Sequence, residues 1–144
     1  MFYKYIIKGV EDMEKFDDLL RKFDLDYFGG GKHKISFEKM MELNKDNKVF
    51  ILDVRTKEEN ECVKLEFAKN IPTSEIPDRI SEIPTDKTIV VFCSSATRAT
   101  IVSVYLQLSG YSDVKILLDS IGEIAGFFKP GYVLKNLDNL SSNK

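Results

Sequence analysis

Three short runs of apolar residues lie along the chain, at residues 49–54, 89–92 and 114–118. Each run is nearly continuous rather than alternating, which is typical of a strand that is covered on both faces. Between the runs lie stretches in which apolar positions recur at helical spacing. Strands that alternate with helices predict an α/β fold with a central, mostly parallel sheet and helices on both faces.

The helices between these strands are expected where the sequence carries signals for their ends. Ser36 can cap a helix that runs to about Leu43, because its hydroxyl can accept a hydrogen bond from a first-turn backbone N–H. Thr56 followed by Glu59 has the form of a capping box, so a short helix is expected to begin there. The Pro-Gly pair at 130–131 is expected to end the last helix. The remaining helices are expected over residues 74–83, 99–108 and 121–128.

The first 33 residues lie outside this alternating pattern. A short strand is expected over residues 3–7, and an amphipathic helix over residues 11–23, where the apolar positions follow helical spacing. The glycine run at 29–31 is interpreted as a turn or linker. A strand-helix extension this short must bury its apolar face, so it either packs on the domain that follows or forms the contact of a homodimer.

The length and composition of the chain fit one main domain. Its 144 residues, 43% of them hydrophobic, suffice for a single core. We divide the chain into the extension of residues 1–33, a domain of residues 34–135 and a polar tail of residues 136–144. The formal net charge of -2 gives no general attraction for nucleic acid or for anionic membranes, so neither is expected as a partner.

Cysteine and histidine usage limits the kinds of site that the chain can form. Two cysteines, Cys62 and Cys93, do not make a disulfide framework. Together with the lack of a recognisable signal peptide or membrane-spanning stretch, they favour a reducing, cytoplasmic setting. A single histidine, His33, and the lack of a Cys-x-x-Cys pair argue against a zinc site. No metal and no cofactor are expected.

The residues that follow the second apolar run carry the strongest chemical signal. Cys93 stands at the end of the strand expected over residues 89–92, and a helix is expected from Ala99 onward. In a parallel sheet, sites lie at this end of the strands. The loop amides and the helix N-terminus would favour a thiolate over a thiol, and Arg98 would add a permanent positive charge. The residues expected to form the site are Cys93, Ser94, Ser95, Ala96, Thr97 and Arg98.

Four pieces of the chain recur as a motif series in one known family, in the same order and with matching spacing. They are Ile51-Leu52-Asp53-Val54-Arg55, Ala68-Lys69-Asn70-Ile71-Pro72, the strand at 89–92 with the loop to Arg98, and Gly110-Tyr111 followed by the strand at 114–118. Over roughly residues 35–133 the chain thus resembles a rhodanese-like domain, the fold of the single-domain sulfurtransferases. Each piece alone is weak evidence, whereas the ordered series is specific.

The resemblance implies an enzyme that moves sulfane sulfur. Cys93 would attack a small sulfur donor, such as thiosulfate, polysulfide or a persulfide, and would hold the outer sulfur as a persulfide. The amides of residues 94–98 would bind this anion, and a thiol acceptor, a protein thiol included, would then collect the sulfur. Four residues separate Cys93 from Arg98. Cysteine phosphatases have a longer loop, so phosphatase activity is not expected.

Departures from the family's motifs leave a second function open. Residues 63–68 and the pair Asp119–Ser120 differ from the sequences that many relatives carry there. Because both stretches are expected to shape the rim of the site, the alternative is a sulfur-carrying or protein-binding module with little turnover on small donors. Cys62 is either a resolving cysteine or, as we favour, a bystander. Asp53 and Arg55 are interpreted as a structural pair that fixes the end of their strand.

Overall fold

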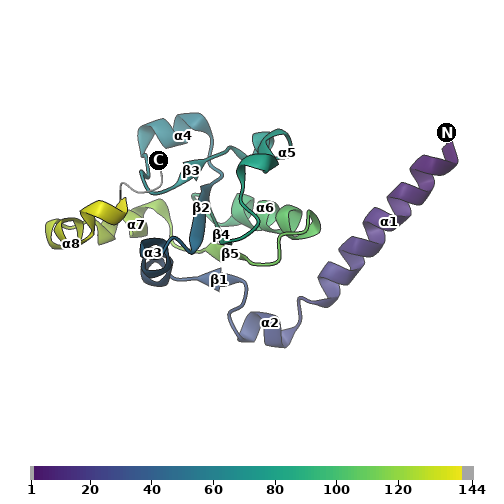
Figure 1. Ribbon diagram of the computed structural model, residues 1–144, viewed down its shortest axis with the longest axis horizontal. Helices are drawn as coiled ribbons and strands as arrows, with labels where there is room; N and C mark the ends of the chain where they lie inside the picture. Colours follow the sequence, from purple (N-terminus) through teal and green to yellow (C-terminus); the bar gives the residue numbers. More distant parts are fainter. Residues whose placement is uncertain (1, 141–144) are drawn as a thin grey trace.

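The computed structural model describes residues 2–140 and shows a five-stranded sheet with helices packed on both faces (Figure 1). All neighbouring strands run parallel, in the order β1-β5-β4-β2-β3. The predicted α/β fold class is confirmed. The strands are β1 (Lys34–Ile35), β2 (Val49–Asp53), β3 (Lys69–Asn70), β4 (Thr88–Phe92) and β5 (Val114–Leu117).

The three central strands coincide with the three apolar runs, and the two edge strands do not correspond to any predicted strand. β2 and β4 pair along their full length, from Val49 opposite Thr88 to Asp53 opposite Phe92. β1 and β3 have two residues each, too short to show a pattern of their own. The three central strands therefore position any site that lies at their carboxyl ends.

Side chains of β4 alternate between two hydrophobic clusters, one on each face of the sheet. Ile89 and Val91 point into a cluster with Val102 and Leu106 of helix α6 (Thr97–Leu108). Val90 and Phe92 point to the opposite face, where helices α3 (Phe37–Lys45) and α7 (Ile121–Phe127) contribute buried side chains. Because both faces are covered, the strands carry apolar residues at nearly every position.

Most of the helices expected in the central domain are present. Ser36 caps α3, and Thr56 with Glu59 forms the capping box of α4 (Lys57–Cys62). The stretch expected as one helix over 74–83 is instead a succession of short helical turns. The remaining elements are α2 (Leu25–Gly29), η1 (Thr73–Glu75), α5 (Ile76–Arg79) and η2 (Ile80–Glu82).

The predicted strand over residues 3–7 is wrong, because these residues belong to one continuous helix, α1 (Phe2–Arg21). Aromatic and β-branched residues at the start of the chain favour a strand. A strand must pair its backbone with a neighbour, however, whereas a helix pairs its own N–H and C=O groups. No strand of the described sheet lies beside α1, so the helical pattern continues to the start of the described residues (Figure 1).

Residues 136–140, the first part of the predicted polar tail, form the end of helix α8 (Pro130–Leu140). Pro130 ends the preceding helix as expected, but it also begins α8, because proline is well tolerated at the first helical position. Within α8, Asn136 is buried and Tyr132 packs against the cluster around Phe37. Residues 141–144 of the predicted tail lie outside the described part of the chain.

Within residues 2–140, none of the helices combines the length and the apolar character that a membrane-spanning helix needs.

Candidate active site

The loop between β4 and α6 lies at the carboxyl edge of the sheet. β4 ends at Phe92, Cys93 follows directly, and α6 begins at Thr97. The turn is closed by Ala96, whose φ of 66° places it in the left-handed region just before the helix. This strained backbone lets the chain reverse within four residues of the strand, so the first N–H groups of α6 face back toward Cys93.

The thiol of Cys93 is buried against the start of α6. Its residue is 1% exposed, and Sγ accepts a hydrogen bond from the backbone N–H of Ala99 at 3.4 Å. That N–H belongs to the first turn of α6 and has no carbonyl partner within the helix. A sulfur anion at Cys93 would therefore be stabilised by a backbone donor and by the positive end of the helix dipole.

Arg98 holds the loop through two groups on different elements. Its Nη2 donates to Ser94 Oγ at 2.9 Å, which joins the two ends of the loop. Both of its terminal nitrogens donate to the carboxylate of Glu59 in α4, at 2.6 and 2.9 Å. The Glu59 carboxylate raises the pKa of Arg98 above its ordinary value. Arg98 therefore bridges Ser94 and Glu59, and its positive charge is already paired with the Glu59 carboxylate.

Glu59 was expected only as a capping residue, and the structure gives it a second role. Its Oε2 accepts the backbone N–H of Thr56 at 2.9 Å, which completes the capping box of α4. The bond from Arg98, with help from that N–H, lowers the pKa of Glu59 to about 2. Glu59 is therefore an anion at neutral pH and fixes α4 against the Cys93 loop. No local signal in the sequence indicates this contact, because the partners are 39 residues apart.

Asp53 and Arg55 form a buried ion pair beneath the same edge of the sheet. Arg55 Nη2 lies 2.7 Å from Asp53 Oδ2, and both side chains are almost fully buried. The same nitrogen donates to the carbonyl of Val63 at 2.8 Å, and the guanidinium lies 5.3 Å from the ring centre of Phe92. The pair thus ties the segment after α4 to the ends of β2 and β4, as a structural pair would.

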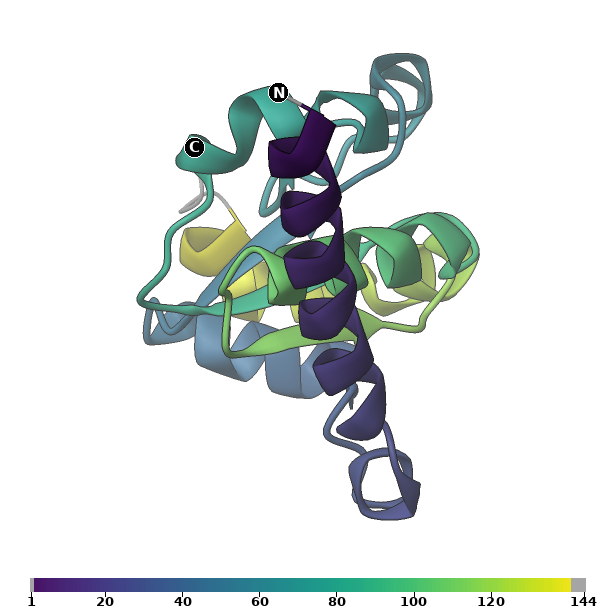
Figure 2. The same ribbon diagram turned by 90° about the vertical axis from the view of Figure 1, so that its right-hand side faces the viewer.

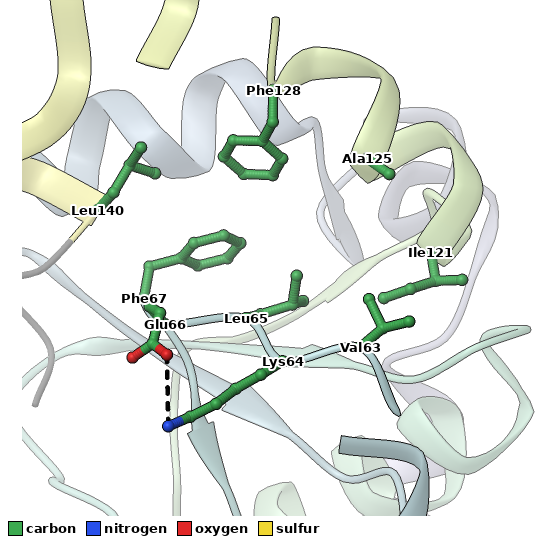
Figure 3. Close-up of a pocket in the computed structure, with 9 residues that line it drawn as sticks. All are labelled: Val63, Lys64, Leu65, Glu66, Phe67, Ile121, Ala125, Phe128 and Leu140. Atoms are coloured by element: carbon green, nitrogen blue, oxygen red, sulfur yellow. Dashed lines mark ion pairs between the residues drawn. The ribbon is translucent and has the colours of Figure 1, made fainter. Parts of the chain in front are cut away.

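One hollow lies beside the loop, and a second hollow adjoins the first. The first, of about 360 Å³, is lined by Ser94 of the loop, by residues of α4 that include Glu59 and Cys62, and by Val63 and Ile121. The second, of about 270 Å³, shares Val63 and Ile121 with it, and its other lining residues are Lys64, Leu65, Glu66, Phe67, Ala125, Phe128 and Leu140. Figure 3 shows the rings and aliphatic side chains around this second hollow, with the Lys64–Glu66 ion pair at its rim.

The family model for the rhodanese-like domain matches residues 36–126, well over half of the chain. The chain belongs to the rhodanese-like domain family. The resemblance inferred from the motif series is confirmed, and the β4–α6 loop with Cys93 lies within the matched residues of this rhodanese-like domain.

Two relatives named as sulfurtransferases match parts of the chain. A protein of Allochromatium vinosum named sulfurtransferase is 36% identical over 66 residues, which are 46% of this chain and 62% of that protein. A tRNA sulfurtransferase of Shewanella piezotolerans is 34% identical over 70 residues, 46% of this chain and 14% of that protein. The chain therefore spans less than two thirds of the length of these curated relatives.

Solved structures share the fold of this rhodanese-like domain. A human single-domain sulfurtransferase superposes with a TM-score of 0.59 at 19% identity and covers 67% of this chain and 97% of its own. A NAD-dependent persulfide reductase of A. fulgidus gives a TM-score of 0.52 at 32% identity, over 67% of this chain and 16% of its own.

The structure brings together some of the residues expected in the site and leaves others at its surface. Cys93 is hydrogen-bonded by the first turn of α6, and the side chain of Arg98 donates a hydrogen bond to that of Ser94. Ala96 supplies the left-handed turn, while Ser95 and Thr97 are exposed. Val63, which lines both hollows, was indicated in the sequence as part of a departure from the family's motifs, whereas Ile121, which also lines both, was expected only as the start of a helix.

Proposed function

We propose that this rhodanese-like protein is a sulfurtransferase that carries sulfane sulfur on Cys93. The observation that carries the proposal is the position of the Cys93 sulfur, buried at the end of β4 and hydrogen-bonded by the first turn of α6. A thiolate and a persulfide are both anionic sulfur species, and this arrangement stabilises either one without a general base. The sulfurtransferase names of its relatives support the same reaction class.

The reaction divides into two sulfur transfers. In the first, the Cys93 thiolate attacks the outer sulfur of the donor and the sulfur–sulfur bond of the donor breaks. The rest of the donor leaves as sulfite from thiosulfate, as a thiolate from a persulfide, or as a shorter polysulfide from polysulfide. In the second, an acceptor thiolate attacks the outer sulfur of the Cys93 persulfide and frees the Cys93 thiolate. No net oxidant or reductant is needed. Since the first product leaves while the sulfur stays covalently bound to Cys93, and the acceptor reacts only afterwards, ping-pong kinetics are expected.

The charge around the loop favours some donors over others. Arg98 is a side-chain cation that contacts the loop, and Glu59 already neutralises it. Thiosulfate is a dianion and gains little attraction from a neutralised cation, because the net charge sets the long-range field. We therefore place organic persulfides, whose terminal sulfur carries a single charge, ahead of thiosulfate as donors, with a small thiol or a protein thiol as acceptor. Because both Cys62 and Cys93 are free thiols, the chemistry suits a reducing compartment such as the cytoplasm.

The test is the intact mass of the protein after brief exposure to polysulfide and, separately, to thiosulfate. We expect the wild type to gain one sulfur atom and to lose it on addition of cyanide. The two cysteines give a matched pair of variants: Cys93→Ser should not gain sulfur, whereas Cys62→Ser should gain it as the wild type does. If Cys93→Ser gained sulfur, or if Cys62→Ser failed to gain it, the sulfur would be carried by Cys62 and the proposal would be refuted.

A sulfur-carrying module that docks to another protein is the second candidate. It is favoured by the apolar hollow beside the site, which is large enough for one or two apolar side chains of a partner protein. This function predicts that Cys93 gains a sulfur atom from polysulfide while steady-state sulfur transfer to cyanide stays negligible. Rapid turnover with small donors and acceptors would leave the enzyme as the better description.

A further inference from the structure

Helix α1 is exposed on every side over most of its length. The side chains of residue 6 and of residues 8–15 are all exposed, and among the described side chains of α1 only Leu19 is buried. In Figure 1, α1 extends away from the sheet and from the helices that cover the sheet, with its N-terminal end farthest from them. Its later turns contact α6, and Figure 2 shows it crossing in front of that part of the domain.

An isolated helix of this kind is poorly stable in water. Most helical stability in proteins comes from burial of an apolar face, and short helices without such burial are marginal. Gly9 in the middle of α1 costs about 1 kcal/mol more than alanine would. We therefore expect another surface to cover the first turns of α1 wherever the helix is formed.

The exposed apolar residues of α1 lie at the spacing of a helix-pairing seam. Ile6, Val10, Met13 and Leu20 are each half exposed or more, with steps of four, three and seven residues. This is the a/d repeat by which two helices interdigitate, with Asp17 at the remaining position. The buried Leu19 and the partly buried Phe16 lie on a neighbouring face of the helix. The seam is therefore separate from the surface that α1 uses within its own chain.

The charges of α1 are divided between its two ends. Residues 2–8 carry two lysines and no acidic residue, and the positive end of the helix dipole lies there too. Residues 11–18 carry five carboxylates and one lysine. A second α1 that runs antiparallel brings each basic end against an acidic stretch, and it also opposes the two helix dipoles. A parallel second copy would instead bring the acidic stretches together.

From this self-complementarity we infer that α1 is a dimerisation helix, which pairs antiparallel with α1 of a second copy along Ile6, Val10 and Met13. An antiparallel pair has the two-fold symmetry that a homodimer needs, since the same surface serves both copies. The N-terminal turns of the partner then lie beside α6, where Ile101 and Tyr105 are exposed. The acidic stretch disfavours the other common cover of such a face, an anionic membrane surface.

Sedimentation velocity of the full chain over a range of concentrations tests the dimer, with two matched variants. We expect the wild type to form a dimer and Val10→Glu with Met13→Glu to raise its Kd at least about a hundredfold, because carboxylates would enter the seam. The control is Leu25→Glu with Leu134→Glu, which also introduces two carboxylates at exposed apolar positions. Both leucines lie outside α1 and are more exposed than Val10 and Met13, so this variant should leave the dimer intact. Far-UV circular dichroism and sulfur uptake by Cys93 report that each variant is folded.

Charge reversal tests the antiparallel arrangement. Lys4→Glu with Lys8→Glu makes the first turns acidic, and Glu11→Lys with Glu14→Lys makes the later turns less acidic. We expect each variant alone to associate more weakly than the wild type, and an equimolar mixture of the two to associate more tightly than either. A wild type that is monomeric at all concentrations, a dimer that survives the seam variant, or a mixture no tighter than its parts would overturn the inference.

Discussion

At the scale of single residues, the net charge near the Cys93 loop depends on the ion pair between Arg98 and Glu59. Arg98 joins the two ends of the loop through its hydrogen bond to Ser94, yet its guanidinium is also hydrogen-bonded to both carboxylate oxygens of Glu59. With a pKa of about 2, Glu59 stays ionised throughout the neutral range, so the pair contributes almost no net charge to the site. The loop is thereby held in shape without being made strongly attractive to anions.

Replacement Glu59→Gln separates these two effects. The amide can still accept a bond from Arg98, but the cation is no longer neutralised, so anionic donors should be attracted more strongly. We expect the KM for thiosulfate at low ionic strength to fall several-fold, and the gain to shrink as salt is added.

Glu61→Gln is the control for this change, because it makes the same substitution on α4 without a contact to Arg98. It should leave the KM unchanged. A KM that rises in Glu59→Gln, or one that falls equally in both variants, would show that the neutralised Arg98 does not limit donor binding.

At the scale of elements, the sequence predicts what is encoded locally. The apolar runs at β2, β4 and β5 are visible because both faces of these strands are covered, and Ser36 and Thr56 mark the starts of α3 and α4. The edge strands β1 and β3 are too short to carry such a pattern.

The site shows the same division. The place of Cys93 follows from the strand-loop-helix order, but the bond between Glu59 and Arg98 joins two helices that are distant in sequence. The apolar hollow likewise needs side chains from α7, α8 and the segment after α4 to come together. Such contacts depend on tertiary packing and leave no periodic signal in the sequence.

The pair Asp53–Arg55 links these elements, so Asp53→Asn should be strongly destabilising. The change leaves Arg55 charged and buried without its anion, and breaking a buried pair in this way typically costs about 3–5 kcal/mol. Urea denaturation should show this loss of unfolding free energy. The matched control is Asp26→Asn, which removes the anion of the exposed Lys32–Asp26 pair outside α1 and should change stability by about 0–1 kcal/mol. Equal losses in both variants would contradict the structural role of the buried pair.

At the scale of the whole molecule, the chain consists of a domain with its own hydrophobic clusters and a helix, α1, that contributes little buried surface to it. The two hydrophobic clusters on the faces of the sheet contain residues from 35 onward, whereas α1 contributes Leu19 as its one buried side chain among those described. The domain thus carries the proposed chemistry, and α1 carries the proposed association. These two properties should be separable.

A chain that begins at Asp24 makes this separation, because it removes α1 and keeps the residue that caps α2. It should fold and take up sulfur on Cys93 as the full chain does. Its unfolding free energy should fall by about 1.5–3 kcal/mol for the buried Leu19, with smaller losses for the partly buried Phe16 and Phe23. Thermal unfolding at several protein concentrations checks both parts. The midpoint of the full chain should rise with concentration, because association stabilises the folded state. The midpoint of the shortened chain should not. A shortened chain that fails to fold would place α1 within the domain, and a midpoint that still rises with concentration would place the interface elsewhere.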